Sequence, residues 1–324
     1  RGQIPEKTGL INFLYAVISL RNAEPYTVRE AMSTALEEMV SNGIAAVGDI
    51  CNTAVSFGVK LSSKINCHNF IELIGIDPAK AGGVFAKGME TYSESVRLGF
   101  SSSIVPHAPY TASPPLLKLI NDFSVENGSS LSIHNQESNS EDEFFMKGTG
   151  PIAEFYKNIG QPLDFFRHTG KKSLSSYLES EPGNGNLLLV HNTYTSLEEI
   201  KNAIRTRDNL YWCFCPNANL YIENNTPDFH LFNSVDCNIV IGTDSLASNR
   251  SLSVLGELKT ITGRGEIPLH TLLKWATING AKFLGLDEKL GSFEKGKKPG
   301  VNLIQEVDFQ NMKLTKASTV KKLF

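Results

Sequence analysis

The sequence predicts an α/β protein, a TIM-like (β/α)8 barrel built from parallel strands. Two observations carry this prediction. Short apolar runs alternate with longer amphipathic runs through most of the 324 residues, which is typical of consecutive βαβ units with right-handed crossovers. No Gly-x-Gly-x-x-Gly motif follows an early strand, so the pattern favours a barrel over an open nucleotide-binding sheet.

The expected elements can be read in order along the chain. Strands are predicted over residues 43–50, 65–74, 102–106, 130–134, 187–191, 211–215 and 238–243. Helices are predicted over residues 7–21, 27–41, 89–98, 114–127, 197–206 and 252–262. The connection over residues 138–160 is the longest and begins with acidic residues, and we expect it to be a functional loop over the site.

Seven predicted strands leave one barrel position open. An open edge exposes unpaired backbone groups, so a closed barrel is expected to have an eighth strand. The chain begins with a helix followed by a strand that resembles the second of the series, and we expect the first strand to precede residue 1. After Gly291 the sequence becomes rich in glycine and lysine. We therefore expect a barrel over residues 1–290 and the C-terminal part of a small β-sandwich over residues 291–324.

Composition narrows the class of protein. The formal charge of −3 gives no field that would attract nucleic acid or an anionic membrane. No apolar stretch reaches the length of about 20 residues that a bilayer span needs, and the N-terminus has no apolar signal core. The five cysteines are scattered and suit free thiols in a reducing cytosol, which predicts a cytoplasmic protein.

Polar side chains stand at the ends of several predicted strands. His107, His134, His191 and Asp244 each end an apolar run. In a barrel the carboxyl ends of the strands form the catalytic mouth, so we expect these side chains to meet there. Imidazole and carboxylate groups suit one divalent ion such as zinc or iron(II), which would activate water at neutral pH.

Each of these residues also has a structural explanation when taken alone. A histidine at a strand end is more often a hydrogen-bonded structural residue, and Asp244 could cap a turn or helix. Glu137 alone would be a solvated loop carboxylate. Their recurrence at the same end of successive strands favours a functional interpretation.

The motifs around these residues occur in an order that resembles the amidohydrolase superfamily. The similarity is to its branch of aminohydrolases and chlorohydrolases, which includes cytosine, guanine and S-adenosylhomocysteine/methylthioadenosine deaminases. A further segment, Glu143 to Pro151, resembles bacterial deaminases of the aminodeoxyfutalosine type. The matching pieces cover nearly the whole chain: Pro106-His107-Ala108-Pro109-Tyr110-Thr111, His134-Asn135-Gln136-Glu137-Ser138, Leu189-Val190-His191-Asn192, Cys215-Pro216-Asn217-Ala218-Asn219, Gly242-Thr243-Asp244-Ser245, Ala276-Thr277-Ile278-Asn279-Gly280-Ala281 and Gly291-Ser292-Phe293-Glu294-Lys295-Gly296.

This resemblance implies a role for each residue of the site. It makes His134 and Asp244 ligands of one metal ion, with Asp244 also accepting the proton of the water. Glu137 would carry that proton to a ring nitrogen of the substrate, and His191 would stabilise the tetrahedral intermediate. The remaining two predicted site residues, His107 and Tyr110, would contact the substrate.

One part of the family pattern is missing. The first two metal ligands of the family are a His-x-His pair at the end of the first strand, and this sequence contains no His-x-His. Either the chain starts just after that motif, or it is a degenerate relative that binds metal poorly. Residues 1–10 are similar to the segment that follows the motif in the family, which favours the first explanation.

The prediction is a metal-dependent hydrolase, a hydrolytic deaminase of an aminated heterocycle such as a purine nucleoside-like adenosine derivative. A chlorohydrolase or a cyclic amide hydrolase would use the same residues. A third possibility is a non-catalytic barrel without metal. The predicted partner is a small-molecule substrate, and the resemblance implies a homodimer.

Overall fold

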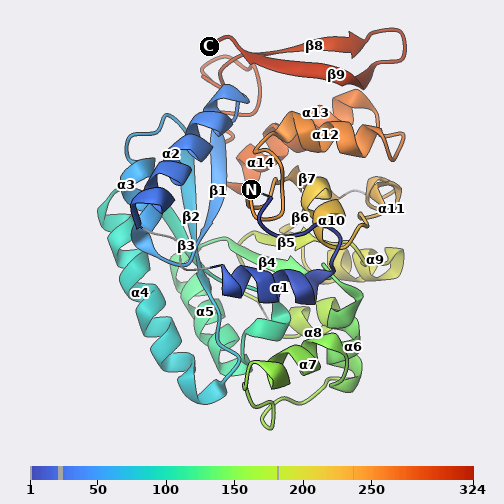
Figure 1. Cartoon of the computed structure of the whole chain (residues 1–324). Coiled ribbons are helices and arrows are strands. Elements are labelled where there is room, and N and C mark those ends of the chain that lie inside the picture. Colours follow the sequence, from blue (N-terminus) through green and yellow to red (C-terminus); the bar gives the residue numbers. More distant parts are fainter. Residues whose placement is uncertain (1, 21–24, 181, 236) are drawn as a thin grey trace.

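The computed structural model describes residues 2–20, 25–180, 182–235 and 237–324 (Figure 1). All seven predicted strands are present, with ends that differ from the prediction by three residues or fewer. They form two parallel sheets with the orders β1-β2-β3 and β4-β5-β6-β7. The strands are β1 Ala46–Cys51, β2 Asn66–Leu73, β3 Ser101–Pro106, β4 Leu131–Asn135, β5 Leu187–His191, β6 Leu210–Phe214 and β7 Asn238–Ile241.

The two parallel sheets meet between β3 and β4. The His134 amide at β4 donates to the carbonyl oxygen of His107, just after β3, at 2.9 Å. The seven strands therefore follow one another around the structure in chain order. Within the described ranges no strand pairing joins β7 to β1, the place where the prediction puts its first strand.

Helices connect and cover the strands, as expected for βαβ units (Figure 1). Helices α5 and α9 have the predicted bounds. In the predicted helix over residues 7–21, residue 21 lies outside the described residues. The longer helices are α1 Leu10–Ser19, α2 Pro25–Ser41, α4 Ala81–Arg97, α5 Pro114–Asn127, α9 Leu197–Thr206 and α12 Val254–Thr262. The shorter ones are α3 Phe57–Lys60, α8 Ser173–Leu178, α10 Pro216–Ile222, α11 Phe229–Asn233, α13 Leu269–Ala276 and α14 Ile278–Phe283.

The prediction of a long loop over residues 138–160 is wrong. This segment folds into two helices, α6 Asn139–Lys147 and α7 Pro151–Asn158. Ser138 caps α6 by accepting a hydrogen bond from the Ser140 amide, and Gly148 ends the helix in a left-handed conformation. Pro151 starts α7 at the first helical position, where its missing N–H costs nothing. These signals are visible in the sequence, but they lie close together and the two helices are short.

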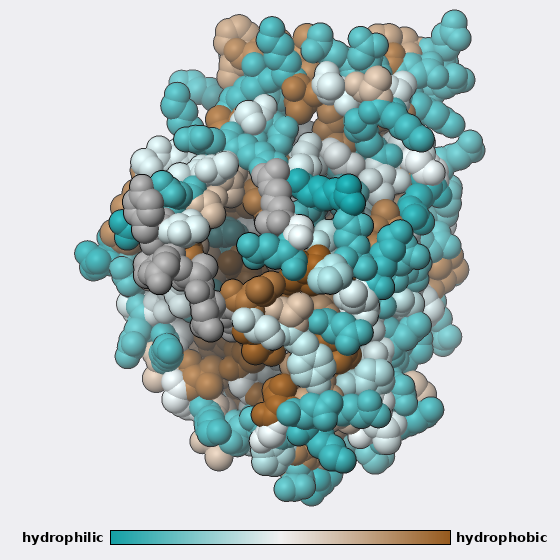
Figure 2. All heavy atoms as spheres, viewed as in Figure 1, coloured by the Kyte–Doolittle hydropathy of each residue, from teal (hydrophilic) through white to brown (hydrophobic). Residues whose placement is uncertain are grey.

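Two apolar clusters hold the molecule together. The larger cluster fills the space between the strands and the covering helices. The smaller one lies beside the residues that follow β3, and combines the N-terminal segment with α6, α7 and α10. Figure 2 shows apolar atoms grouped in the middle of the face that carries α1. The buried members of the smaller cluster are Ile4, Leu10, Phe13, Ala108, Tyr110, Phe144, Phe145, Ile152, Phe155, Tyr156, Tyr221 and Ile222.

The end of the chain forms an antiparallel hairpin of β8 Asn302–Asp308 and β9 Lys313–Lys322. The hairpin lies at one end of the molecule (Figure 1, top). It is attached to the barrel by a hydrogen bond from the Asn302 side chain to Gly43 O at 2.9 Å. A second bond joins Lys259 Nζ to Ser318 O at 3.0 Å. None of the helices in the described ranges is long and apolar enough to cross a bilayer.

His68 makes stability depend on pH. Its Nδ1 and Nε2 lie 2.8 and 3.0 Å from the hydroxyls of Ser101 and Ser103, and burial lowers its pKa to about 4. Because the folded pKa lies below the unfolded value, the contribution of His68 to the free energy of unfolding is fully present above pH 6.5 and falls as the pH drops toward 4.

We expect the protonation of His68 to account for about 2 kcal/mol of the loss in stability between pH 6.5 and pH 4. Thermal unfolding at pH 7, 5.5 and 4.5 should show a smaller decline in His68→Gln than in wild type. The exposed control His168→Gln should decline as wild type does.

Candidate active site

The strand ends bring several ionisable side chains to one end of the barrel. Side chains two residues apart share a face of a strand, so in β2 Glu72 lies on the same face as His68 and Phe70, nearer the carboxyl end. Glu72, His107 and His134 offer ligand atoms that all lie within 4.8 Å of one another. Among the described residues, these three side chains form the group that could hold a metal ion. Asp244 is outside it.

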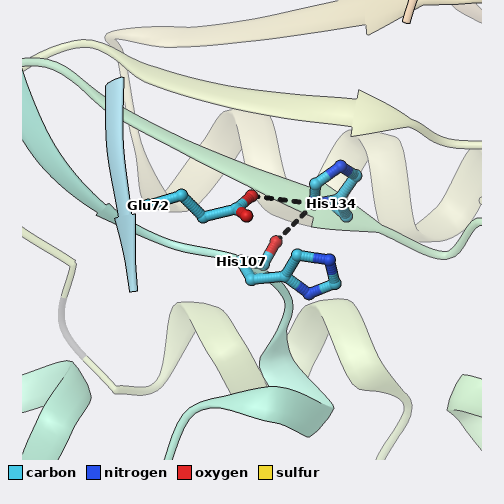
Figure 3. A group of neighbouring side chains, drawn as sticks. All are labelled: Glu72, His107 and His134. Atoms are coloured by element: carbon cyan, nitrogen blue, oxygen red, sulfur yellow. Dashed lines mark hydrogen bonds and ion pairs between the residues drawn. The ribbon is translucent and has the colours of Figure 1, made fainter. Parts of the chain in front are cut away.

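His134 is held at one ring nitrogen (Figure 3). Its Nδ1 lies 2.5 Å from the carbonyl oxygen of His107 and 3.8 Å from Oε1 of Glu72. A carbonyl can only accept, so Nδ1 must carry the hydrogen. The neutral ring then has its lone pair on Nε2. Nε2 of His134 thus has a lone pair that is available to a cation.

His191 is almost completely buried at the end of β5. Its ring stacks on that of His134 at a centroid distance of 5.3 Å. Burial is the main cause that lowers the pKa of His191 to about 3, and the neighbouring His134 adds to the effect. The Asn219 amide donates to Nδ1 at 3.1 Å, so the neutral ring carries its hydrogen on Nε2. This N–H can donate to an oxygen that gains negative charge.

Glu137 is the carboxyl nearest to that N–H. Its Oε1 lies 3.7 Å from Nε2 of His191. Burial raises the pKa of Glu137 well above the usual range, and the charges of Asp244 and Glu141 raise it further. A carboxyl whose pKa is raised keeps its proton to a higher pH than an exposed one does, which suits a group that must deliver a proton.

Asp244 follows β7 and acts on the site through its charge. At Glu137, burial has the larger effect in raising the pKa, and the charge of Asp244 adds to it. At His191, burial has the larger effect and lowers the pKa, while the charge of Asp244 opposes it. Its Oδ1 accepts from the Ser245 amide and its Oδ2 from the Ser248 hydroxyl, both at 2.6 Å. These are the bonds of a turn-capping aspartate, and each oxygen keeps a further lone pair for an ion.

The two predicted substrate contacts lie beside this group. The His107 ring is 4.6 Å from that of His134 and 6.4 Å from that of Tyr110. Nδ1 of His107 lies 3.1 Å from the Thr111 hydroxyl. Tyr110 is buried, and its carbonyl accepts from the hydroxyl of Tyr156 at 2.8 Å. Both residues belong to the turn after β3, and Tyr110 is a buried member of the smaller apolar cluster.

The backbone turns sharply at these strand ends. Gln136, His191, Asn192 and Asp244 all have positive φ, at 43°, 77°, 58° and 55°. Residues other than glycine pay about 1 kcal/mol or more for this conformation. Such strain persists only where the surrounding structure enforces it, and it is concentrated at functional sites. Here it occurs at the ends of three strands, β4, β5 and β7, where the predicted site residues stand.

The side chains present fit a divalent ion. His134 offers the Nε2 lone pair, and Glu72 and His107 offer further ligand atoms in the same group of side chains. Nitrogen and carboxylate donors suit zinc or iron(II).

Sequence reasoning missed Glu72 and the residues that support the predicted site. Glu72 interrupts the apolar run Phe70-Ile71-Glu72-Leu73 near the strand end. A single charged residue within an apolar strand, close to its carboxyl end, is a signal in the sequence that could have identified Glu72. Asn219 is not among the predicted site residues, but its amide donates to Nδ1 of His191.

Glu141 holds the turn that carries Glu137. Its Oε1 accepts from the Glu137 amide at 2.8 Å, and its Oε2 accepts from the Gln136 amide at 3.0 Å and the Ser173 hydroxyl at 3.1 Å. Glutamine at position 141 would set an N–H against one of these donors. We expect Glu141→Gln to lower the free energy of unfolding by about 1–3 kcal/mol in urea denaturation. The exposed Glu154→Gln should change it by less than about 0.5 kcal/mol, and equal effects in the two variants would contradict the assignment.

Comparison with known proteins adds a family to this geometry. A family model described as the amidohydrolase family matches residues 7–324. The chain is 26% identical over 281 residues to adenosine deaminase of Helicobacter pylori, covering 84% of this chain and 67% of that protein. It is 28% identical over 253 residues to aminodeoxyfutalosine deaminase of Nitratiruptor sp., covering 77% of this chain and 60% of that protein. The chain thus spans about three fifths to two thirds of the length of these curated relatives.

Solved structures show the same fold. Aminofutalosine deaminase of Helicobacter pylori, in complex with methylthio-coformycin, has a TM-score of 0.77 at 24% identity. The match covers 93% of this chain and 73% of that one. Adenosine deaminase of Xanthomonas campestris with bound zinc has a TM-score of 0.72 at 20% identity, covering 92% of this chain and 66% of that one.

Proposed function

Because this chain belongs to the amidohydrolase family, we propose that it is a metal-dependent hydrolase that deaminates an aminated heterocycle. The substrate class is a purine nucleoside-like compound such as an adenosine derivative. The names of the two relatives, both deaminases of adenosine-type compounds, support this class.

The proposed ligands of one divalent ion are His134 and Asp244. A bound ion of this kind lowers the pKa of water to about 7, so that hydroxide is available at neutral pH. Zinc is the first candidate, since it suits the nitrogen and carboxylate donors. In this proposal the carboxylate of Asp244 also accepts the proton that the water loses.

Glu137 and His191 have complementary tasks in the proposed reaction. The protonated carboxyl of Glu137 donates to a ring nitrogen of the heterocycle, which makes the amine-bearing carbon a better electrophile. Nε2–H of His191 donates to the oxygen that attacks this carbon, and so stabilises its charge. The proton that Asp244 accepted would pass to the amine, which leaves as ammonia. The proton of the attacking hydroxyl would return to Glu137, leaving a carbonyl group and a protonated ring nitrogen in the product. His107 and Tyr110 contact the substrate beside these groups.

The observation that carries the proposal is the pairing of His191 with Glu137. A buried imidazole whose pKa is lowered and a buried carboxyl whose pKa is raised lie 3.7 Å apart. Burial favours the neutral form of both groups, and neighbouring ionisable groups with such shifted pKa values are typical of acid–base catalysis.

The test is ammonia release from a panel of substrates by the full-length protein. We expect release from adenosine, methylthioadenosine, S-adenosylhomocysteine or aminodeoxyfutalosine. Chlorinated triazines and cyclic amides serve as the rival substrates, and turnover of these without ammonia release from the first group would reject deamination.

Metal analysis separates an enzyme from a non-catalytic barrel. We expect close to one equivalent of zinc or iron in the purified full-length protein. Less than about one-tenth of an equivalent would favour a barrel that binds a small molecule without turning it over.

Three further predictions belong to this proposal. A cytoplasmic location is proposed, because Cys51, Cys67, Cys213 and Cys215 are free thiols that suit a reducing compartment. A homodimer is predicted, and native mass spectrometry would test it. Residues 291–324 are proposed to be part of a small β-sandwich distinct from the barrel over residues 1–290.

A further inference from the structure

We propose that Glu72 is a positioning residue for His134, holding the ring in the tautomer and orientation in which Nε2 can bind the ion. The inference rests on the proposed function, because it assigns a role at the same metal site. It adds a carboxylate that neither the motif pattern nor the predicted ligand set contains.

The first argument is the side of the ring that Glu72 faces. Its Oε1 lies 3.8 Å from Nδ1 of His134, the nitrogen that also bonds the His107 carbonyl at 2.5 Å. Figure 3 shows the carboxylate and the carbonyl converging on this ring. The hydrogen on Nδ1 is therefore directed to the His107 carbonyl, with the Glu72 carboxylate close by, and an ion can bind only at Nε2.

The second argument is the cost of burying a carboxylate. Glu72 is 7% exposed, and a buried charge needs a partner to be tolerated. Among the described residues, the ion-pair partner of Glu72 is His134. Its other recorded contact is Oε2 accepting from the Asn52 amide at 2.9 Å. The carboxylate of Glu72 therefore has one neutral amide donor, Asn52, and one imidazole, His134, beside it. Its charge acts on the His134 ring.

The physical effect follows from charge. When an imidazole binds a cation through one nitrogen, its other N–H becomes more positive, and a nearby carboxylate stabilises that state. It also makes the ring a stronger ligand. Carboxylates or carbonyls that bond the far N–H of a ligand histidine typically change metal affinity about 10–100-fold. Glu72 and the His107 carbonyl together supply this arrangement for His134.

Asn52 fixes the carboxylate in turn. It follows β1, and its side-chain amide bonds both the backbone oxygen and Oε2 of Glu72 at 3.3 and 2.9 Å. The ends of β1, β2 and β4 are thus joined through three side chains, Asn52, Glu72 and His134. Rotation of the carboxylate away from His134 would break the bond to Asn52.

The experiment measures the zinc dissociation constant of the full-length protein by competition with a chromogenic chelator. Glu72→Gln removes the charge and keeps the size, and we expect the dissociation constant to rise about 10–100-fold. Glu126→Gln, the same change on the exposed side of α5, should leave it as in wild type. Glu72→Asp should recover part of the affinity, and the melting temperature of the metal-free Glu72→Gln protein should stay close to that of the wild type.

Asn52→Ala is the second variant, chosen because the exposed Asn52 can be truncated without a cavity. We expect a weaker effect, about three- to tenfold, since the carboxylate remains but is free to rotate. Equal zinc affinity in Glu72→Gln and wild type would overturn the inference while leaving the proposed function standing. A loss above about 1000-fold with an altered cobalt(II) absorption spectrum would also overturn it, because Glu72 would then be a direct ligand. If the wild type binds no zinc, the proposed function itself fails.

Discussion

Replacing Glu137 with glutamine is expected to lower kcat by about 10²–10⁴-fold. Glutamine has nearly the same shape and keeps the Glu137 backbone bond to Glu141, but it cannot deliver a proton. The ring nitrogen of the substrate would then receive its proton only from water. Steady-state ammonia release at pH 7 measures the change.

The binding of substrate should change little in this variant, so KM is expected to stay within about threefold. Glu143→Gln, a change at a carboxyl in α6 outside the site, is the matched control and should keep wild-type kcat. Full activity in Glu137→Gln would show that the proton follows another route, and the proposed pairing of Glu137 with His191 would be wrong.

Replacing His134 with alanine is expected to remove most of the bound metal and with it the activity. A complete set of about four protein ligands binds zinc with about 10–16 kcal/mol. Losing one ligand therefore weakens binding by about 10²–10³-fold. Metal content after dialysis and ammonia release should fall together, and excess zinc should restore part of both.

The exposed His168→Ala is the control for this variant and should retain metal and activity. Adding imidazole to His134→Ala offers a second check, because a small ligand can occupy the space that the ring leaves. If His134→Ala keeps its metal, the ion is held by other residues, and the proposed ligand set is wrong.

The strand ends were predictable because they are local signals. An apolar run that stops at a histidine places that histidine at the mouth of a barrel, whatever the loops do. His107, His134 and His191 were found in this way, and the structure brings their rings together. Helices α5 and α9 were equally clear, since Ser196 and Glu199 form a capping box and Pro114 starts its helix.

Side-chain partners across strands were not predictable in this way. Nothing near Glu72 in the sequence indicates that it will meet His134, which is 62 positions later. The same holds for Asn219 and His191, whose bond joins residues 28 positions apart. Their contacts depend on barrel curvature and on the register between strands, and one sequence without relatives does not specify either at atomic detail.

The carbonyl oxygen of His107 connects two parts of the site. The carbonyl of His107 receives hydrogen bonds from both the backbone and the ring of His134, and His107 begins the turn that holds Tyr110. Any displacement of this turn by an incoming molecule is transmitted to the His134 ring through a connection only one atom long. If His134 binds the ion and Tyr110 contacts the substrate, as proposed, recognition and ion binding cannot be tuned separately. A change that reshapes the turn for a new substrate will also alter the hold on the ion, which restricts the order in which substitutions can accumulate as such an enzyme diversifies.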